Sequence, residues 1–219
     1  YQSMLRHFRN CERNAYFDDE YHGRQGALSV QNLARPHPHA ERLLLAALQA
    51  GYRFNPDFNG AVQEGVGLYQ VTMQGNQRCS AARAFLDPVR GRRNLEIVTG
   101  AQVSRIHLEQ GRASGVSYEC EGAPLAMTAR AGREVIVSAG AFNSPKLLML
   151  SGIGPAAELQ KHGIDLAVEL PGVGQNLQEH VDVVIGTRSR VKDTGSQTLK
   201  SIAQMAVGLI QYNLGKPGP

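Results

Sequence analysis

The pattern of apolar and polar positions changes near residue 95 of this 219-residue chain. Before that point, apolar residues recur at helical spacing or in short alternating runs, separated by loops rich in Gly, Asn and Asp. The pattern predicts the end of a helix and a charged turn within 1–22, a strand over 26–30, a loop over 35–39, an amphipathic helix over 40–50, a loop over 54–67, a strand over 68–72 and a helix over 80–86 capped by Ser80.

Short β-type runs follow one another from residue 95 onwards. They occupy 95–98, 103–108, 113–119, 125–129 and 135–137, with turns at 109–112 and 121–123 that are typical of hairpins. We therefore expect a β-meander packed against the sheet that holds a dinucleotide.

The end of the chain predicts two more elements, a strand over 181–190 and a helix over 201–214 that ends at Gly215. The helix carries a row of apolar side chains on one face, namely Ile202, Met205, Leu209 and Tyr212. That face suits a protein core, or a surface left exposed in a shortened chain, better than it suits a membrane.

The stretch 134–154 carries the clearest local signal. Its run Val-Ile-Val at 135–137 is β-branched without alternation, which predicts a strand buried on both faces of an α/β sheet. Small residues follow at 138–141, past the carboxyl end of that strand, where ligands bind in open α/β sheets. Glycine there lets the backbone approach a ligand closely.

A helix is predicted to follow in the same stretch. Asn143 or Ser144 can serve as its N-cap, and Pro145 suits the first helical position, where a missing N–H costs nothing. Its residues are mostly apolar, so we expect the helix to be buried, and Gly152 is the natural left-handed residue after its last turn.

These residues also carry a family resemblance. The run 140–154, Gly-Ala-Phe-Asn-Ser-Pro-Lys-Leu-Leu-Met-Leu-Ser-Gly-Ile-Gly, is similar to the second signature of the glucose-methanol-choline (GMC) flavoprotein oxidoreductases. The similarity continues through 155–159, 162–164 and 170–180, and upstream it includes 78–86 and 95–103. Recognisable similarity covers roughly residues 22–190.

The resemblance implies a mixed α/β fold and a chain that is the central fragment of such an enzyme. Residues 1–92 would be part of the substrate-binding or cap region, and 93–178 part of the FAD-binding domain, with its sheet and β-meander. Residues 179–219 would begin a second segment of the substrate domain.

The resemblance further implies where FAD binds. The backbone of Val103 would meet the adenine, and Ala139 with Gly140 would lie against the adenosine or pyrophosphate part. His180 would be a neighbour of the active site, although a histidine satisfied by backbone groups explains it equally well. Tyr69, Gln70 and Thr72 would line the substrate side, and Arg78 with Ser80 would help to shape the flavin side.

Two parts of the catalytic apparatus are expected to lie outside this chain. The family's Gly-x-Gly-x-x-Gly turn belongs near the N-terminus of the full protein, and its catalytic histidine in the C-terminal part. The run 152–157 has the spacing Gly-x-Gly-x-x-Ala, but it follows a helix, so the required strand-turn-helix context is missing. We therefore expect the chain alone to be colourless and inactive.

The implied reaction of the parent enzyme is oxidation of a CH–OH donor to the aldehyde by hydride transfer to the flavin, with a separate electron acceptor. Residues 175–182 resemble the choline dehydrogenase and acceptor-dependent alcohol dehydrogenase branch. The alternative is a stand-alone, non-catalytic binding or interaction module derived from the same fold.

Composition and charge limit the kinds of partner that we expect this chain to bind. The net charge is +4 and the pI about 9.1, but the basic residues are scattered and cluster only at 90–93, which argues against nucleic acid. His37 and His39 lie between prolines and suit an extended connection better than a metal site. Metal-type cysteine spacing is absent.

Three cysteines, Cys11, Cys79 and Cys120, are consistent with free thiols in a reducing cytoplasm. No apolar run reaches transmembrane length. The expected location is the cytoplasm or the periphery of the inner membrane, and membrane association of the parent enzyme stays open. The sequence does not indicate an oligomeric state.

Overall fold

The computed structural model describes residues 1–122, 125–184 and 199–214. Internal contacts divide the chain into two units, Tyr1–Leu95 with Gly186–Pro219, and Glu96–Ile185. This division does not test the roles expected for 1–92, 93–178 and 179–219, which stay predictions. Each unit is described by itself.

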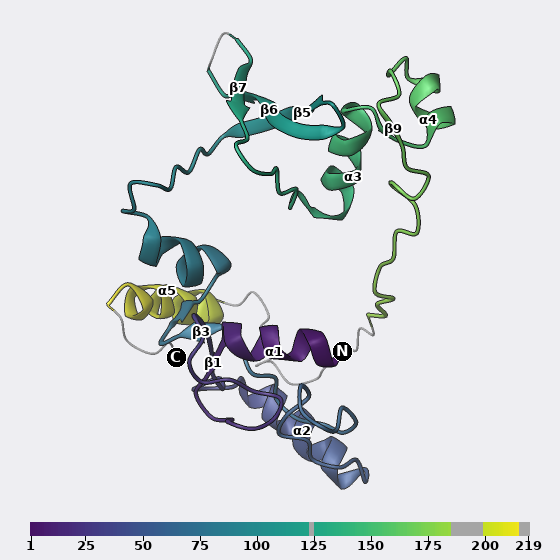
Figure 1. The fold of residues 1–219 in the computed structure, drawn as a ribbon. Coiled ribbons are helices and arrows are strands. Elements are labelled where there is room, and N and C mark those ends of the chain that lie inside the picture. The colour runs from purple at the N-terminus through teal and green to yellow at the C-terminus, as the bar shows by residue number, and fades with distance from the viewer. Residues whose placement is uncertain (123–124, 185–198, 215–219) are drawn as a thin grey trace. The chain divides into compact units, whose positions relative to one another are not determined.

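The first unit combines helices with small two-stranded pairings (Figure 1). Its elements are α1 (Gln2–Cys11), β1 (Glu12–Asn14), β2 (Leu28–Val30), α2 (Pro38–Gln49), β3 (Met73–Gln74), β4 (Gln77–Arg78), a π-helical turn η1 (Ala82–Leu86), a 3₁₀ turn η2 (Asp87–Val89) and α5 (Leu199–Asn213). Strand β1 pairs with β2 in parallel, and β3 pairs with β4 in an antiparallel hairpin.

The local predictions for the first unit are confirmed in part. The helix expected over 40–50 is α2, although it begins at Pro38. There Nδ1 of His37 accepts a hydrogen bond from the His39 backbone N–H at 3.2 Å, so part of the expected loop 35–39 forms the helix start. Of the helix expected over 80–86, residues 82–86 form the π-helical turn η1, whose N-cap is Ala81 and not Ser80. Ser80 Oγ accepts from the Arg83 backbone N–H at 3.3 Å just before this turn.

The prediction of a strand over 68–72 is wrong. Only Val71 pairs there, in an isolated antiparallel bridge with Gln31, and the regular strand β3 begins at Met73. The helix expected over 201–214 is confirmed as α5, in which Ile202, Met205, Leu209 and Tyr212 are exposed. Of the strand expected over 181–190, residues 181–184 form no strand and the rest lies outside the described residues.

The second unit is built on an antiparallel sheet in the order β5-β6-β7 (Figure 1). The elements of this unit are β5 (Ala101–Glu109), β6 (Arg112–Cys120), β7 (Met127–Arg130), α3 (Gly140–Leu150), β8 (Ile153–Gly154), α4 (Ala156–Lys161) and β9 (Val168–Glu169). Helix α3 packs against β5, and β8 pairs with β9 in parallel. The predicted β-meander and the mixed helix-and-strand class are confirmed.

Two expected strands do not form. Residues 95–98 and 135–137 have no strand pairing, and the Ile136 side chain is 78% exposed. A strand forms only where a neighbour takes up its backbone hydrogen bonds, and none of the described strands lies beside 135–137.

Helix α3 also begins earlier than expected. Its first residue is Gly140, Ala139 is the N-cap, and Pro145 lies inside the helix. The Ser144 hydroxyl accepts a hydrogen bond from the Ala139 backbone N–H at 3.0 Å, so the Ser144 side chain points back toward the N-terminal end of the helix. Gly152 follows the helix with φ +83°, as predicted.

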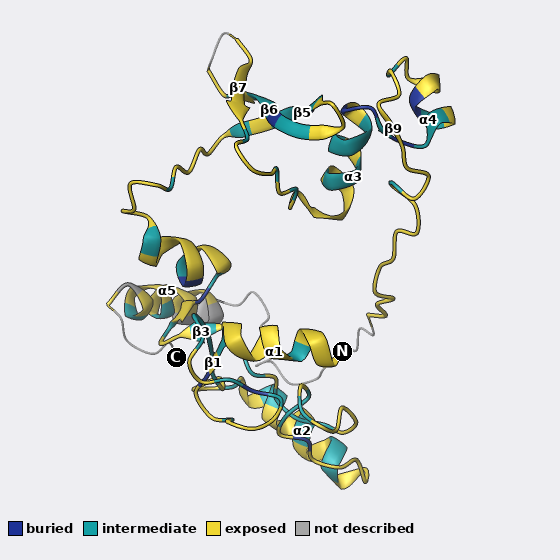
Figure 2. Ribbon diagram, viewed as in Figure 1, coloured by how far each residue is buried: buried dark blue, intermediate teal, exposed yellow. Residues whose placement is uncertain are grey.

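Few apolar side chains are buried in the described residues (Figure 2). The buried apolar residues are Cys79 and Ala84 in the first unit and Ile106 and Leu159 in the second. No residue of α3 is buried, which corrects the expectation of a buried helix. None of the described helices combines the length and apolar character needed to span a bilayer.

Candidate functional site

Val103 lies on β5, an outer strand of the three-stranded sheet. It pairs with Tyr118 of β6 just before an irregularity in the register, between Val103 and Arg105. The Gln102 side-chain amide donates to the Val103 carbonyl at 3.2 Å. The predicted adenine contact therefore sits half-buried on a strand whose backbone is locally irregular.

Ala139 and Gly140 form the exposed start of α3. Gly140 has φ +88°, and no atom of the described chain lies within 4 Å of the position that a Cβ would occupy. L-residues that carry a side chain rarely adopt this backbone conformation, so glycine is the suitable residue here. The combination of a positive φ and open space leaves room for a ligand against the backbone.

Ser151 connects this helix to the sheet. Its hydroxyl accepts a hydrogen bond from the Ile106 backbone N–H at 2.8 Å and donates to the Leu147 carbonyl at 2.6 Å. Ser151 and Ile106 are both buried. The link fixes β5 to the C-terminal end of α3, whereas Gly140 lies at the opposite end of the helix.

His180 is exposed and lies within 175–184, a stretch without regular secondary structure. Its backbone N–H donates to the Glu179 carboxylate at 2.8 Å. Among the described residues, no contact joins its side chain to Val103, Ala139 or Gly140. The structure therefore leaves its predicted place beside the active site untested.

The run 152–157 follows α3, as the sequence predicts, and the short strand β8 lies within the run and not before it, so the strand-turn-helix context is missing. The start of α4 is also already occupied. Both carboxylate oxygens of Glu169 accept from the Ala156 backbone N–H, at 3.0 and 3.3 Å. A negative charge thus sits where a dinucleotide phosphate would bind.

A buried polar cluster in the first unit brings together residues that no local sequence pattern groups. His22, which is 2% exposed, lies between two carboxylates from different segments. Its Nδ1 is 3.0 Å from Oε2 of Glu12, and its Nε2 is 3.0 Å from Oδ2 of Asp57. The His22 backbone N–H donates to Asp19 at 3.0 Å.

Asn14 extends this cluster and is also 2% exposed. Its side-chain amide donates to Glu12 at 2.9 Å and to the side chain of Gln70 at 2.8 Å, while its carbonyl accepts from the backbone N–H groups of Tyr16 and Phe17. Contacts that span up to 56 residues leave no local sequence pattern, which is why the sequence does not reveal the cluster.

The carboxylates and His22 also present a metal-type donor set. Ligand atoms of Asp19, His22 and Asp57 lie within 4.8 Å of one another. However, both ring nitrogens of His22 already face carboxylate oxygens at hydrogen-bond distance, and Asp19 accepts two backbone N–H groups, those of Tyr21 and His22. The arrangement fits an ion-paired histidine better than a metal ligand.

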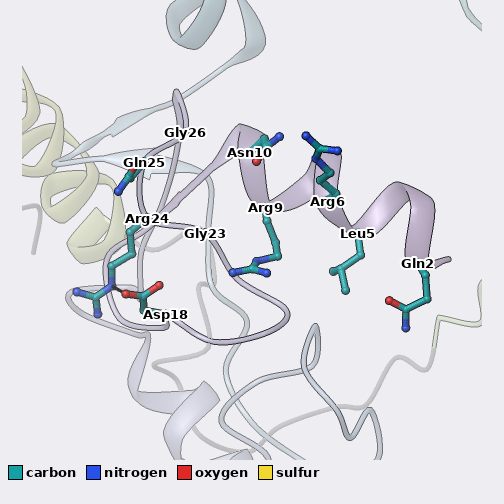
Figure 3. Close-up of a pocket in the computed structure, with 10 residues that line it drawn as sticks. All are labelled: Gln2, Leu5, Arg6, Arg9, Asn10, Asp18, Gly23, Arg24, Gln25 and Gly26. Atoms are coloured by element: carbon teal, nitrogen blue, oxygen red, sulfur yellow. Dashed lines mark ion pairs between the residues drawn. The ribbon is translucent and has the colours of Figure 1, made fainter.

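Two cavities lie beside the cluster. One of about 770 Å³ is lined by His22 and Glu12, by apolar residues of α1 and β2, and by 59–61. The other, of about 680 Å³, lies between α1 and the loop that contains Gly23. Figure 3 shows that Arg9 extends toward this loop, that Arg6 points another way, and that Arg24 lies beside Asp18. The arginines do not converge on one point.

Comparison with known proteins identifies the chain's relatives. A family profile described as GMC oxidoreductase matches residues 1–182. The chain is 42% identical over 212 residues to an alcohol dehydrogenase [acceptor] of Pseudomonas putida, covering 96% of this chain and 38% of that protein. It is 41% identical over 218 residues to an oxygen-dependent choline dehydrogenase of Brucella ovis, covering 100% and 39%.

Solved structures agree. An FAD-dependent oxidoreductase from Chaetomium thermophilum, in complex with a small-molecule fragment, superposes with a TM-score of 0.82 at 27% identity, over 100% of this chain and 40% of that one. A pyridoxine 4-oxidase from Mesorbium loti gives a TM-score of 0.71 at 30% identity, over 78% and 33%. The chain thus spans about two fifths of the length of the curated relatives described above. It belongs to the GMC oxidoreductase family.

Proposed function

We propose that the protein containing this chain binds FAD and oxidises an alcohol, choline or a simple alcohol, to the aldehyde. The observation that carries the proposal is the identity of 41–42% over nearly the whole chain to relatives named as alcohol and choline dehydrogenases. Oxidation of the carbinol removes two electrons and two protons. Bound FAD would supply the group that accepts the electrons from the alcohol, and a separate acceptor would then receive them from the reduced cofactor.

The residues present fit such a cofactor at the start of α3. Gly140 keeps open the space that a Cβ would fill, and Ala139 adds only a methyl group beside it. In this proposal Ala139 and Gly140 lie against the adenosine or pyrophosphate part, and the Val103 backbone meets the adenine. The residues would bind and orient the cofactor, which is the protein's contribution in cofactor enzymes.

The remaining assignments belong to the same proposal. His180 would lie beside the substrate cavity, residues 93–178 would belong to the FAD-binding domain, and 1–92 with 179–219 to the substrate-binding region. The free thiols of the cysteines support a cytoplasmic location, and a place at the periphery of the inner membrane belongs to the same proposal.

Assays of the full-length protein test this function. We expect a yellow preparation with about one FAD per protein, and alcohol-dependent reduction of an artificial acceptor dye across choline and simple primary alcohols. A colourless full-length protein, or one that no alcohol reduces, would contradict the proposal.

The Gly140 assignment has its own matched test. Gly140→Ala should lower FAD occupancy, because its methyl group enters the space assigned to the cofactor. Gly163→Ala is the control, since Gly163 also has a positive φ and open space at its Cβ position, so the backbone strain is similar. Equal flavin content in the two variants would remove Gly140 from the proposed site.

A further inference from the structure

His22 joins two segments that are far apart in the sequence. Glu12 belongs to β1, which is fixed by its pairing with β2, whereas Asp57 belongs to the loop 54–67. The side chain of His22 is 3% exposed, and those of Glu12 and Asp57 are 17% and 16% exposed. The contact between them is therefore largely shielded from water.

The hydrogen count at His22 requires a protonated ring. A carboxylate only accepts hydrogen bonds, and a neutral imidazole has a single N–H to donate. Both ring nitrogens face carboxylate oxygens at 3.0 Å, so only the imidazolium can donate to Glu12 and Asp57 together. The side-chain nitrogen of Asn14 also lies 3.2 Å from Nδ1, but its two hydrogens are used by Glu12 and Gln70.

The charges of the groups around the His22 ring also favour its protonated form. Glu12, Asp57 and Asp19 face His22 with negative charge, and Asp19 accepts the His22 backbone N–H. The nearby positive group is Arg9 of α1, whose Nε donates to the His22 carbonyl at 3.1 Å. The negative groups outnumber the positive one, which favours a proton on the ring.

The loop held by Asp57 is organised around Asn55. Asn55 is 6% exposed, and its amide donates to the carbonyls of Val62 at 2.7 Å and Glu64 at 3.2 Å. These bonds hold the loop together as one unit. Its residues 59–61 form one wall of the 770 Å³ cavity that His22 also lines.

We propose that His22 is a proton-operated clamp: protonated, it ties the loop 54–67 to β1 and closes one wall of this cavity, and on deprotonation the Asp57 contact opens. Loss of one N–H leaves one carboxylate facing a ring lone pair. The Asp57 side opens because Asp57 lies on a loop outside the helices and strands, while Glu12 is held on the paired strand β1 and keeps its bonds to Asn14 and to the Gly23 backbone N–H.

The pKa of His22 supports this direction. Burial lowers the pKa, but the hydrogen bonds to Glu12 and Asp57 and the charges of those carboxylates outweigh it, so that the pKa lies above its ordinary value of 6.5. The stabilisation is thus fully present below pH 6.5 and is lost as the pH rises through the raised pKa.

Hydrogen–deuterium exchange of the full-length protein between pH 5.5 and 9 tests the clamp. After correction for intrinsic exchange, peptides from 54–67 should exchange about tenfold faster at the high end of this range, as expected for the loss of one hydrogen bond to a charged group. In His22→Gln this exchange should be fast at every pH, because glutamine does not titrate. His107→Gln is the control, since His107 bonds to the Ser117 hydroxyl, and should keep the parent's pH dependence.

A second variant keeps the test decisive if His22→Gln fails to fold. Asp57→Asn retains an acceptor for Nε2–H but removes one negative charge, so the transition should move to lower pH. Exchange in 54–67 that does not depend on pH in the parent protein, or an unchanged midpoint in Asp57→Asn, would overturn the proposal. Neither outcome depends on whether the protein oxidises alcohols.

Discussion

At the scale of single residues, buried polar side chains hold the segments of each unit together. Ser151 joins β5 to α3, Asn55 organises the loop 54–67, and Asn14 connects β1 to the segment at Gln70. A buried donor or acceptor that loses its partner costs more free energy than the bond itself contributes. Each of these residues should therefore be sensitive to substitution.

Ser151→Ala tests this at the junction of sheet and helix. It leaves the Ile106 N–H buried without its acceptor, and should lower the local free energy of opening at β5 by about 1–3 kcal/mol. Native-state hydrogen exchange of the β5 amides in the full-length protein measures this. Ser104→Ala is the control, because the Ser104 hydroxyl makes only a 3.4 Å contact with the Ser117 carbonyl. An equal fall in the opening free energy of β5 in both variants would contradict a specific role of Ser151 at this junction.

The residue scale is also where prediction from sequence is weakest. The bond from the Arg83 N–H to Ser80 could be predicted because the two residues are three apart, and Gly152 could be predicted as a helix end because the residues before it are helical. The partners of His22 lie 10 and 35 residues away, in segments of unlike structure. Nothing in the local pattern brings them together.

At the scale of elements, the alternation of apolar and polar residues and the residue types in turns predict strands and hairpins that form from neighbouring segments. The β-meander is recognisable because its strands alternate and its hairpin turns carry glycines, with Gly111 and Gly122 both at positive φ. The run 135–137 has an equally clear pattern but forms no strand, because a strand buried on both faces needs neighbours that the described residues do not provide. A sequence pattern records the environment that a segment suits.

The ends of α3 and α4 give a prediction at this scale. Gly152 and Gly163 both have positive φ just past a helix, but a Cβ on Gly152 would lie 2.5 Å from the Asp165 carbonyl oxygen, while one on Gly163 meets nothing within 4 Å. Gly163→Ala should cost about 1–2 kcal/mol from backbone strain. Gly152→Ala should cost about 3 kcal/mol or more, because overpacking adds to that strain. Thermal melting of the full-length variants compares them, and equal shifts would refute the steric argument.

At the scale of the whole chain, the described residues bury few apolar side chains. Phe142 is 72% exposed, Val181 94% and Leu125 77%, although proteins usually bury such residues. A hydrophobic core is the main source of folding stability. The apolar pattern of this sequence therefore suits a larger core than the described residues form.

This has a direct experimental consequence for residues 1–219 expressed alone. We expect the chain to bind the dye 8-anilinonaphthalene-1-sulfonate strongly, to unfold without a sharp transition and to carry no stoichiometric flavin. Fluorescence, circular dichroism melting and visible absorption spectra measure these properties, with the full-length protein for comparison. A cooperative transition or a yellow chain would show that these residues are self-sufficient.

The position of Glu169 has a consequence for protein design. Its carboxylate sits on the Ala156 N–H at the start of α4, inside a run that matches the spacing of a dinucleotide-binding turn. The protein thus carries its own competitor for any anion at that position. An engineer who wished to convert this turn into a nucleotide site would first have to replace Glu169 with a neutral residue, since the glycine spacing alone cannot recruit a phosphate against a resident negative charge.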